Sequence, residues 1–472
     1  MSRKEQLLKR HRRNKRVALL IGLVLLIVVG MSVVWWLPLL LAVVAWVGHE
    51  AWFADYLFYS PKDDYQYRFP ADSEQLNVRW QGEYLRLGDP LTLVGDETLI
   101  LGIPIKSSWL GRFIDPAIDV LGADVTDRQT FERGVDGLRY LNLTGCGAAL
   151  VDGSLRLRGR YCRLPGRPRL WLFRHADARR QRVMVIAPHA DDAELAAFGV
   201  YSHADEAWIV TLTAGEIEAE HYQQMGMSRA EAARIKGRLR AWDSITVPRW
   251  GGVPEAHCVQ LGYFCLQLPA MQAAPDQPIA SREAELGDTR LFRQFNPMLL
   301  PGDADGAPTW NNLLADLRAL ILKARPEVLV MPHPSMDPHP DHICAQAAVL
   351  EALQGLEWQP RTILGYANHL HDNDRWPMGD AYSGVSLPPY FGAADLMDKL
   401  IPYSVELSPS TQRDKAMALG MMHDLQPPPP FKRRVRRWLQ QILVGRRWPA
   451  EGENEFFRKA VRRHELFWRR DI

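Results

Sequence analysis

Residues 17–47 form an unbroken apolar run without a charged side chain, and this run constrains the chain more than any other feature. About 20 apolar residues suffice to cross the hydrocarbon core of a bilayer. A cleavable signal peptide is the alternative, but its apolar core is normally only ~7–15 residues long. Pro38 divides the run, yet halves of about 15 residues are too short to span a bilayer separately. We therefore predict one uncleaved transmembrane anchor over residues 17–47, with Trp35, Trp36 and Trp46 near the membrane interfaces.

Charge is distributed unevenly along the chain. Residues 1–16 carry eight Lys or Arg and one Glu, and residues 431–472 carry thirteen Lys or Arg and five Asp or Glu. Because the whole chain has a net charge of only +2, residues 17–430 carry about −13. A nucleic-acid-binding core would carry positive charge on the folded domain itself, so we expect no nucleic-acid partner. Basic ends instead favour contact with an anionic membrane surface.

The flanks of the apolar run predict its orientation in a bacterial-type inner membrane. Residues 1–16 are expected to stay in the cytoplasm, because Lys and Arg next to a membrane segment are retained there. The flank that follows the run has few basic residues, Lys62 and Arg68 among them. We therefore expect a single-pass protein whose body lies outside the cytoplasm, with a cytoplasmic body as the alternative.

Cysteine spacing bears on the same question. Cys146 and Cys162 flank a predicted turn at residues 151–154 between two strands, and Cys258 lies close in sequence to Cys265. Two such pairs would fit disulfides formed in an oxidising compartment. Buried, reduced thiols are the equally supported alternative.

Hydrophobic patterning predicts an α/β protein with two folded parts beyond the apolar run. Residues 60–175 contain short alternating runs between Gly, Asp and Pro, which predicts a β-rich, sandwich-like accessory domain. In residues 180–425 apolar strand-like runs alternate with helical stretches, which predicts a Rossmann-like, mainly parallel sheet with helices on both faces. Residues 426–472 begin with a Pro-rich break and continue as a basic tail. Its residues 431–448 have the apolar spacing of an interfacial helix, a solvated basic helix being the alternative.

Two groups of polar residues follow strand-like runs of the predicted parallel sheet. His189, Asp191 and Asp192 follow one run, and His339 and His342 follow another. The carboxyl ends of parallel strands meet at one edge of a sheet. Three His or carboxylate ligands with an open fourth position make a catalytic zinc site, where a further carboxylate can act as general base. Asp-rich helix caps would explain either group alone, so their joint occurrence is what predicts a metal-dependent hydrolase.

Three motifs within residues 180–425 resemble those of the PIG-L/LmbE-like zinc-dependent de-N-acetylases. Residues 188–194, PHADDAE, are similar to the PHxDDxE signature of that family, and residues 211–216, TLTAGE, are similar to its T-x-G-E turn. Residues 339–342, HPDH, are similar to its third motif. The resemblance implies hydrolysis of the N-acetyl group of an amino sugar, commonly GlcNAc joined to a lipid or small aglycone, to acetate and a free amine.

The resemblance also implies a role for each motif residue. One Zn²⁺ per chain, or another divalent ion, would be held by His189, Asp192 and His342. Asp191 would act as the general base. His339 would stabilise the oxyanion and protonate the departing amine, and Asp341 would orient His339.

The chain departs from the family pattern on the helix that follows the T-x-G-E turn. Residues 234–237 read RIKG, which keeps the Arg of the family's R-x-x-E element and lacks its Glu. Arg234 is expected either to bind a substrate hydroxyl or phosphate or to be a solvated helix residue. The polar residues 368–372 are expected either at the rim of the pocket or in a surface loop.

Taken with the apolar run, these motifs predict a membrane-anchored, zinc-dependent N-acetylglucosaminyl-type deacetylase. Its substrate would be an N-acetylated amino sugar of a glycolipid or envelope glycoconjugate such as lipopolysaccharide. A metal-dependent phosphoesterase is a second hypothesis, because Asp and His clusters also serve two-metal sites. A non-catalytic glycan-binding membrane protein is a third. Metal content separates the third from the other two, and acetate release separates the first from the second.

Overall fold

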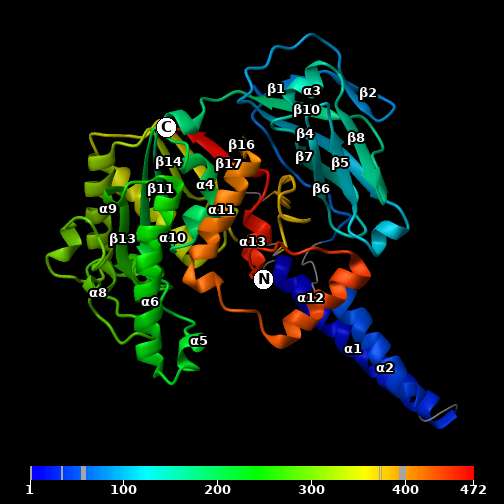
Figure 1. The fold of residues 1–472 in the computed structure, drawn as a ribbon, viewed down its shortest axis with the longest axis horizontal. Helices are drawn as coiled ribbons and strands as arrows, with labels where there is room; N and C mark the ends of the chain where they lie inside the picture. The colour runs from blue at the N-terminus through cyan, green and yellow to red at the C-terminus, as the bar shows by residue number, and fades with distance from the viewer. Residues whose placement is uncertain (1–2, 33–35, 55–59, 371–372, 374, 393–399) are drawn as a thin grey trace.

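The chain contains two antiparallel sheets, a larger mixed sheet covered by helices, and a projecting pair of helices (Figure 1). The computed structural model describes residues 1–472 except 1–2, 33–35, 55–59, 371–372, 374 and 393–399.

The predicted β-rich part is a sandwich of two sheets whose neighbouring strands are antiparallel. One sheet has the order β1-β10-β4-β7 with β9 on β4, and the other has the order β2-β3-β8-β5-β6. Leu101 and Ile103 of β4 and Ile118 of β5 share one buried cluster, because alternate residues of each strand face the other sheet. The bounds are β1 (Glu74–Leu76), β2 (Val78–Gln81), β3 (Tyr84–Leu87), β4 (Thr98–Ser107), β5 (Ala117–Leu121), β6 (Thr126–Thr130), β7 (Asp136–Asn142), β8 (Arg156–Arg160), β9 (Cys162–Arg163) and β10 (Arg169–Phe173).

The second part is built on a seven-stranded sheet with the order β13-β12-β11-β14-β15-β17-β16. The pairs from β13 to β15 are parallel, whereas β17 runs antiparallel to both β15 and β16. The bounds are β11 (Arg182–Ala187), β12 (Glu206–Thr213), β13 (Cys258–Tyr263), β14 (Val328–Pro332), β15 (Thr362–Tyr366), β16 (Ile401–Glu406) and β17 (His464–Asp471).

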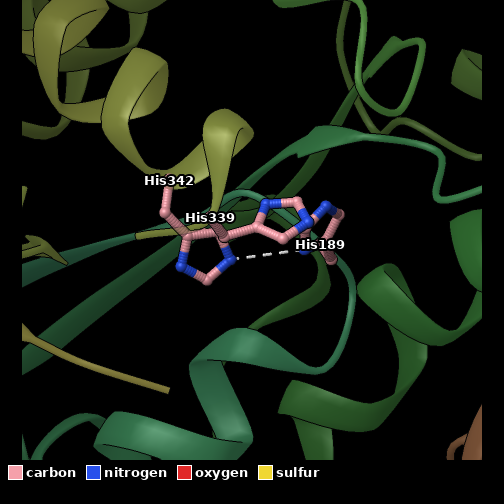
Figure 2. Close-up of side chains that lie close together, drawn as sticks. All are labelled: His189, His339 and His342. Atoms are coloured by element: carbon pink, nitrogen blue, oxygen red, sulfur yellow. Dashed lines mark hydrogen bonds between the residues drawn. The ribbon is translucent and has the colours of Figure 1, made fainter. Parts of the chain in front are cut away.

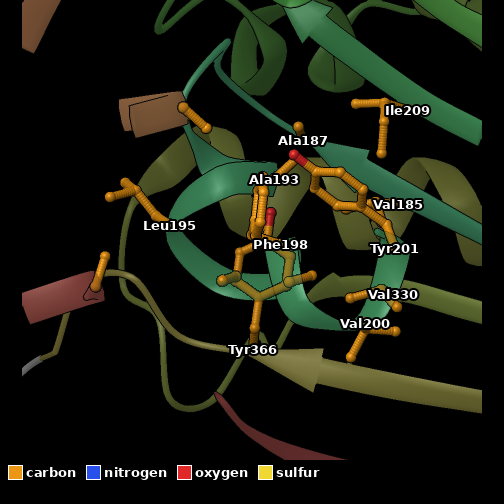
Figure 3. Packing of buried hydrophobic residues seen from close by; sticks show 14 of the residues in the cluster. Val185, Ala187, Ala193, Leu195, Phe198, Val200, Tyr201, Ile209, Val330 and Tyr366 are labelled. Carbon is orange, nitrogen blue, oxygen red and sulfur yellow. The ribbon is translucent and has the colours of Figure 1, made fainter. Parts of the chain in front are cut away.

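Helices cover both faces of this sheet, as predicted. Helices α4, α11 and α13 share one buried cluster with it, and α7, α9 and α10 share another. Figure 3 shows Phe198 and Tyr201 of α4 beside Val185 and Ile209 of the sheet. Every residue of α4 is buried, including Asp192 and Glu194 in its first turn. The bounds are α3 (Gly147–Val151), α4 (Asp192–Tyr201), α5 (Glu220–Gln223), α6 (Arg229–Thr246), α7 (Leu268–Ala273), α8 (Arg290–Arg293), α9 (Trp310–Ala324), α10 (Pro340–Leu353), α11 (Pro409–Met421), α12 (Phe431–Val444) and α13 (Glu455–Ala460).

The end of the chain belongs to the α/β part, although residues 426–472 were predicted to be a basic tail. Strand β17 lies between β15 and β16 and supplies buried side chains such as Phe467 and Trp468. Its apolar residues, Leu466 to Trp468, form a run of only three that is obscured by the Arg residues around it. The sheet therefore extends beyond the predicted boundary at residue 425.

The apolar run does not form the single transmembrane helix predicted over residues 17–47. Among the described residues, no helix is both long enough and apolar enough to cross a membrane. The run is divided between α1 (Arg3–Ser32), whose first half is basic, and α2 (Leu37–Gly48), which has Pro38 in its first turn. Trp35, one of the three predicted interfacial residues, lies outside the described residues.

The two disulfides that were one of the alternatives do not form, since all five cysteines are free thiols. The predicted hairpin between Cys146 and Cys162 does not form, because residues 147–151 are the helix α3. Cys162 instead donates its thiol to the carbonyl oxygen of Ala117, with an Sγ–O distance of 3.5 Å. The alternative of reduced thiols therefore describes this structure.

Candidate metal centre and active site

The two predicted polar groups lie at the carboxyl ends of adjacent parallel strands, β11 and β14. Immediately after β11 a short turn presents His189 and Asp191, and Asp192 begins α4. A loop after β14 leads to His339, which is the N-cap of α10, and His342 lies in the first turn of that helix. The parallel pairing therefore brings together residues that are about 150 positions apart in sequence.

Three of the side chains form a compact tripod. The Oδ2 atom of Asp192 lies 3.2 Å from His189 Nδ1 and 3.1 Å from His342 Nε2. The two nitrogens are 3.4 Å from each other, and this contact is the dashed line in Figure 2. Ligand atoms of a tetrahedral zinc ion are about 3.3–3.5 Å apart, because each lies about 2.0–2.1 Å from the metal. The donor set and its spacing therefore fit one divalent ion.

Each member of the tripod is held from behind by a further polar group. Asp337 Oδ2 is 2.9 Å from His342 Nδ1, and the side-chain amide of Asn368 donates to Asp192 Oδ1 over 2.7 Å. Asp337 also accepts the backbone N–H of Asn368 over 2.9 Å, which links the two supports. Such outer partners fix the tautomer and orientation of metal ligands. Neither Asp337 nor Asn368 was predicted as a support, although Asp337 precedes the HPDH motif by only two residues.

The third support comes from Asp341, which was predicted to orient His339. Its Oδ2 atom is 3.2 Å from Nε2 of His189 and accepts the backbone N–H of Leu266 over 2.8 Å. His339 lies edge-on to His189, with ring centroids 4.9 Å apart, and its Nδ1 has no hydrogen-bond partner among the described residues. The structure therefore places Asp341 behind a tripod member and leaves a buried nitrogen of His339 available.

Two wider groupings of possible ligand atoms overlap with the tripod. His339 contributes a nitrogen to a set with His189 and His342, and Cys265 contributes its sulfur to a set with His189 and Asp341. Within each set the atoms lie within 4.8 Å of one another. His189 belongs to both, so the strand end after β11 is the centre of the candidate site.

Charge within the site strongly favours the ionised forms of the paired groups. Burial lowers the pKa of His342, but the neighbouring carboxylates of Asp192 and Asp337 outweigh it and raise the pKa to about 9. The reverse holds for Asp192, since His342 and His189 overcome its burial and hold its pKa well below the usual range. A site with this much negative charge around two imidazoles attracts a cation.

Asp191, the predicted general base, is held by a buried arginine that the sequence did not single out. Arg240 on α6 donates from Nη2 to Asp191 Oδ1 over 3.0 Å and from Nη1 to Asp424 Oδ2 over 2.5 Å. Lys236 lies one turn earlier on α6, and its Nζ is 3.0 Å from the other oxygen of Asp424. The guanidinium therefore bridges Asp191 to Asp424, in the short turn that follows α11.

The weakly predicted substrate residue, Arg234, does not join this group. Its Nε donates to the backbone carbonyl of Ala284 over 2.8 Å. Asn368, from the segment whose role was left open, does reach the site, and the ring of His369 lies 5.3 Å from that of His339 between centroids. The other predicted residues all gather at this edge of the sheet: His189, Asp191, Asp192, His339, Asp341 and His342.

Comparison with known proteins was made for both the sequence and the fold. No curated protein matches the sequence. Similar solved structures include N,N'-diacetylchitobiose deacetylase from Pyrococcus horikoshii, with 14% identity over 58% of this chain and 82% of that one and a TM-score of 0.31. A deacetylase triple mutant of teicoplanin biosynthesis has 15% identity over 62% and 98%, with a TM-score of 0.31. GalB, a 4-carboxy-2-hydroxymuconate hydratase from Pseudomonas putida, has 13% identity over 55% and 83%, with a TM-score of 0.29.

A family model described as PIG-L: GlcNAc-PI de-N-acetylase matches residues 184–353. The matched region runs from β11 to the end of α10 and contains every member of the tripod. Residues 184–353 of this chain are therefore a PIG-L family domain.

Proposed function

We propose that this protein is a metal-dependent amidohydrolase that removes the N-acetyl group from an amino sugar. The observation that carries the proposal is the tripod of His189, Asp192 and His342, supported from behind by Asp341, Asn368 and Asp337. The family description, GlcNAc-PI de-N-acetylase, supports an N-acetylated glucosamine as the reacting group.

The tripod would hold one divalent ion, and two imidazoles with one carboxylate form a ligand set that zinc accepts. A bound ion of this kind supplies Lewis acidity, which makes hydroxide available near neutral pH. The protein's own contribution is to orient the three ligands and to bring proton-transfer groups beside them.

Exposure distinguishes the two adjacent aspartates. The side chain of Asp192 is 2% exposed and points into the tripod, whereas that of Asp191 is 13% exposed. Asp191 is therefore the carboxylate that a water molecule and a substrate can reach. Its bridge to Arg240 fixes the carboxylate in one position, as a general base requires.

The reaction follows from these positions. Asp191 takes a proton from water as the oxygen bonds to the acetyl carbon, and an N–H of His339 donates to the carbonyl oxygen as it gains negative charge. The carbon–nitrogen bond then breaks, and the amine nitrogen receives a proton from His339, which regains one from Asp191. Amide and water are thereby converted to acetate and a free amino sugar.

We further propose that the amino sugar belongs to a glycolipid or envelope glycoconjugate. Support comes from the exposed apolar side chains of α1 and α2, among them Leu20 and Val44, and from the basic helix α12. A protein that rests on a membrane meets substrates in that membrane without first extracting them.

Acetate release from N-acetylglucosamine conjugates, measured together with metal content, tests the proposed function. Wild-type protein should contain one divalent ion and release one acetate for each free amine formed. A chelator should remove both the ion and the activity. An exposed aspartate far from the tripod, Asp205, supplies the control variant Asp205→Asn, which should behave as wild type. Phosphate release from phosphoesters without acetate release would instead favour a phosphoesterase.

A further inference from the structure

We infer that α1 and α2 form a hairpin that inserts into one face of an anionic phospholipid bilayer, with both of its ends on the same side. The inference goes beyond the proposed function and does not depend on it. It differs from the single-pass arrangement expected from the sequence, in which the two ends lie on opposite sides.

A contact at the far end of the pair and the proximity of two histidines at the near end indicate that the two helices run antiparallel. At the far end, Pro38 of α2 lies 3.1 Å from the position that a Cβ on Gly30 of α1 would occupy. At the near end, His49 is close enough to His11 to contribute to the lowering of its pKa, after burial and Lys15. Figure 1 shows the pair projecting away from the rest of the chain. The hairpin is thus joined to the body at one end only.

The projecting part of the hairpin exposes apolar side chains around both helices. On α1, Leu20, Leu23 and Leu25 are 67%, 57% and 59% exposed, and on α2, Leu39 and Val44 are 69% and 59% exposed. Helix α2 has no buried residue. Soluble monomers rarely expose contiguous apolar surface of this extent, and a helix that is apolar all round normally has an apolar environment.

The length of the hairpin suits partial insertion. Helix α2 has 12 residues, which at 1.5 Å per residue is about 18 Å. The hydrocarbon core of a bilayer is about 30 Å thick, so one leaflet contributes about 15 Å. Helix α2 therefore reaches through one leaflet.

The base of the hairpin carries the charge that an anionic membrane surface attracts. Arg12, Arg13 and Arg16 of α1 are exposed there, and so are Arg433 and Arg434 of α12. Helix α12 is fixed to this base, because Arg436 pairs with Glu50 over 2.7 Å and Gln440 donates to the Glu50 carbonyl over 3.3 Å. Each such Lys or Arg near an anionic surface strengthens binding about fivefold. The rest of the chain is acidic, so an anionic membrane surface would repel it and the body would lie away from the lipid.

Aromatic residues from three segments lie near the base of the hairpin. Trp52, next to the end of α2, donates its indole N–H to the carbonyl of Phe113 in the sandwich over 3.0 Å. Close by in the chain, Trp109 is 69% exposed and packs against the ring of Phe113, and Trp438 of α12 is 60% exposed. Trp and exposed aromatic rings at the junction of apolar and basic surface are typical of a membrane interface. The base of the hairpin therefore has the aromatic and basic residues that are typical of a membrane–water interface.

Flotation of the full chain with vesicles tests the insertion. The probes are phosphatidylcholine vesicles and vesicles that contain about one-third phosphatidylglycerol, at low and high salt. Wild type should float with both and at least about tenfold more strongly with the anionic vesicles at low salt. Leu20→Glu combined with Val44→Glu should abolish flotation, whereas Arg433→Glu with Arg434→Glu should reduce the preference for anionic vesicles and leave binding to phosphatidylcholine vesicles unchanged.

Matched controls are available on other surfaces. Leu299 is 90% exposed and Arg167 and Arg361 are exposed, so Leu299→Glu and the double change Arg167→Glu with Arg361→Glu should bind as wild type does. None of these residues lies in the candidate active site, so acetate release from a water-soluble N-acetylglucosamine conjugate should be unchanged in every variant. Wild-type flotation by the Leu20/Val44 variant would overturn the inference. So would a hairpin that joins copies of the chain into oligomers without binding vesicles.

Reporter fusions at the two termini test the same-side arrangement in cells. Both termini should report the same side, the cytoplasmic side expected for basic residues 1–16. The C-terminal Ile472 is 59% exposed and can carry a fusion. Reporters on opposite sides would show a single span and overturn the hairpin, whether or not the deacetylase activity is found.

Discussion

The carboxylate oxygen Oδ2 of Asp341 lies 3.2 Å from Nε2 of His189, while Nδ1 of the same ring faces Asp192 and His342. Asp341 is thereby separated from the proposed metal position by the full width of the imidazole. A carboxylate in this place accepts the N–H of Nε2, which leaves the lone pair on Nδ1 free to bind a metal ion. The carboxylate also raises the basicity of Nδ1. This contact predicts that Asp341 acts through His189, whereas the motif resemblance alone assigned it to His339.

Replacing Asp341 with Asn should weaken the metal site rather than the proton transfer. Loss of such an outer partner typically costs 10–100-fold in metal affinity. Asp337→Asn should produce a similar loss through His342, whose Nδ1 it contacts. Competition with a chelator measures both affinities. If Asp341→Asn kept full affinity but shifted the acidic limb of the pH–rate profile, Asp341 would act on His339.

The same substitution at the two adjacent aspartates should give different defects. Asp192→Asn replaces a tripod carboxylate by a poor metal ligand, so metal and activity should be lost together. Asp191→Asn removes a proton acceptor outside the tripod, so metal should stay while kcat falls by about 10²–10⁴. Metal analysis and acetate release on the same preparations check this. Metal loss in Asp191→Asn alone would reverse the two roles.

Arg240→Lys should lower kcat without removing the metal. The guanidinium of Arg240 bridges Asp191 and Asp424, and a lysine ammonium cannot reproduce that two-armed contact. A misplaced Asp191 would lower kcat by up to about 10²-fold, with little change in KM. Arg234→Lys on the same helix is the control, because the Arg234 guanidinium donates to the backbone carbonyl oxygen of Ala284, which is not part of the candidate site. An equal loss in Arg234→Lys would point to a general effect of α6.

Acidification should weaken the junction between the sandwich and the α/β part through His175. This residue lies against Tyr403 of β16, with ring centroids 4.0 Å apart, and its Nε2 is 2.9 Å from Thr98 Oγ1 of β4. Burial lowers the pKa of His175 to about 4, against 6.5 in the unfolded chain. The unfolded state therefore binds more protons between these values, and stability falls as the pH drops from 6.5 towards 4.

At pH 5, the titration of His175 should lower the free energy of unfolding by roughly 2 kcal/mol relative to neutral pH. His175→Gln keeps a polar group beside Thr98 and cannot titrate, so its stability should depend less on pH in this range. Urea unfolding at pH 7 and pH 5 measures the difference between the two proteins. His221→Gln changes an exposed histidine and should leave the wild-type dependence intact. Parallel pH curves for wild type and His175→Gln would contradict the prediction.

Local pattern predicted the sheet-and-helix core because it depends on periodicities that are visible in short segments. Strands β11 and β14 are buried on both faces and read as continuous apolar runs, and the sandwich strands alternate. Strand β17 escaped prediction because its partners β15 and β16 are about 60–100 residues away, and nothing in its own sequence identifies them.

The apolar run at residues 17–47 shows what composition alone cannot predict. Its composition determines that it needs an apolar environment, but composition is the same for one long helix and for two antiparallel ones. The choice depends on contacts at the two ends, between Gly30 and Pro38 and between the base and α12. The contact between Arg436 of α12 and Glu50 joins segments nearly 400 residues apart, so no local window of the sequence predicts it.

The residues of the candidate site could be predicted from the sequence, but their contacts with one another could not. The order of His and Asp residues after two apolar strands determined which side chains meet, because parallel strands carry their carboxyl ends to one edge. Only the folded chain decided which of them touch: Asp341 on His189, Asn368 on Asp192, and Arg240 between Asp191 and Asp424. Those contacts depend on distances of about 3 Å between loops and helices from separate parts of the sequence, and hydrogen bonds that weaken steeply beyond this range are set by tertiary packing alone.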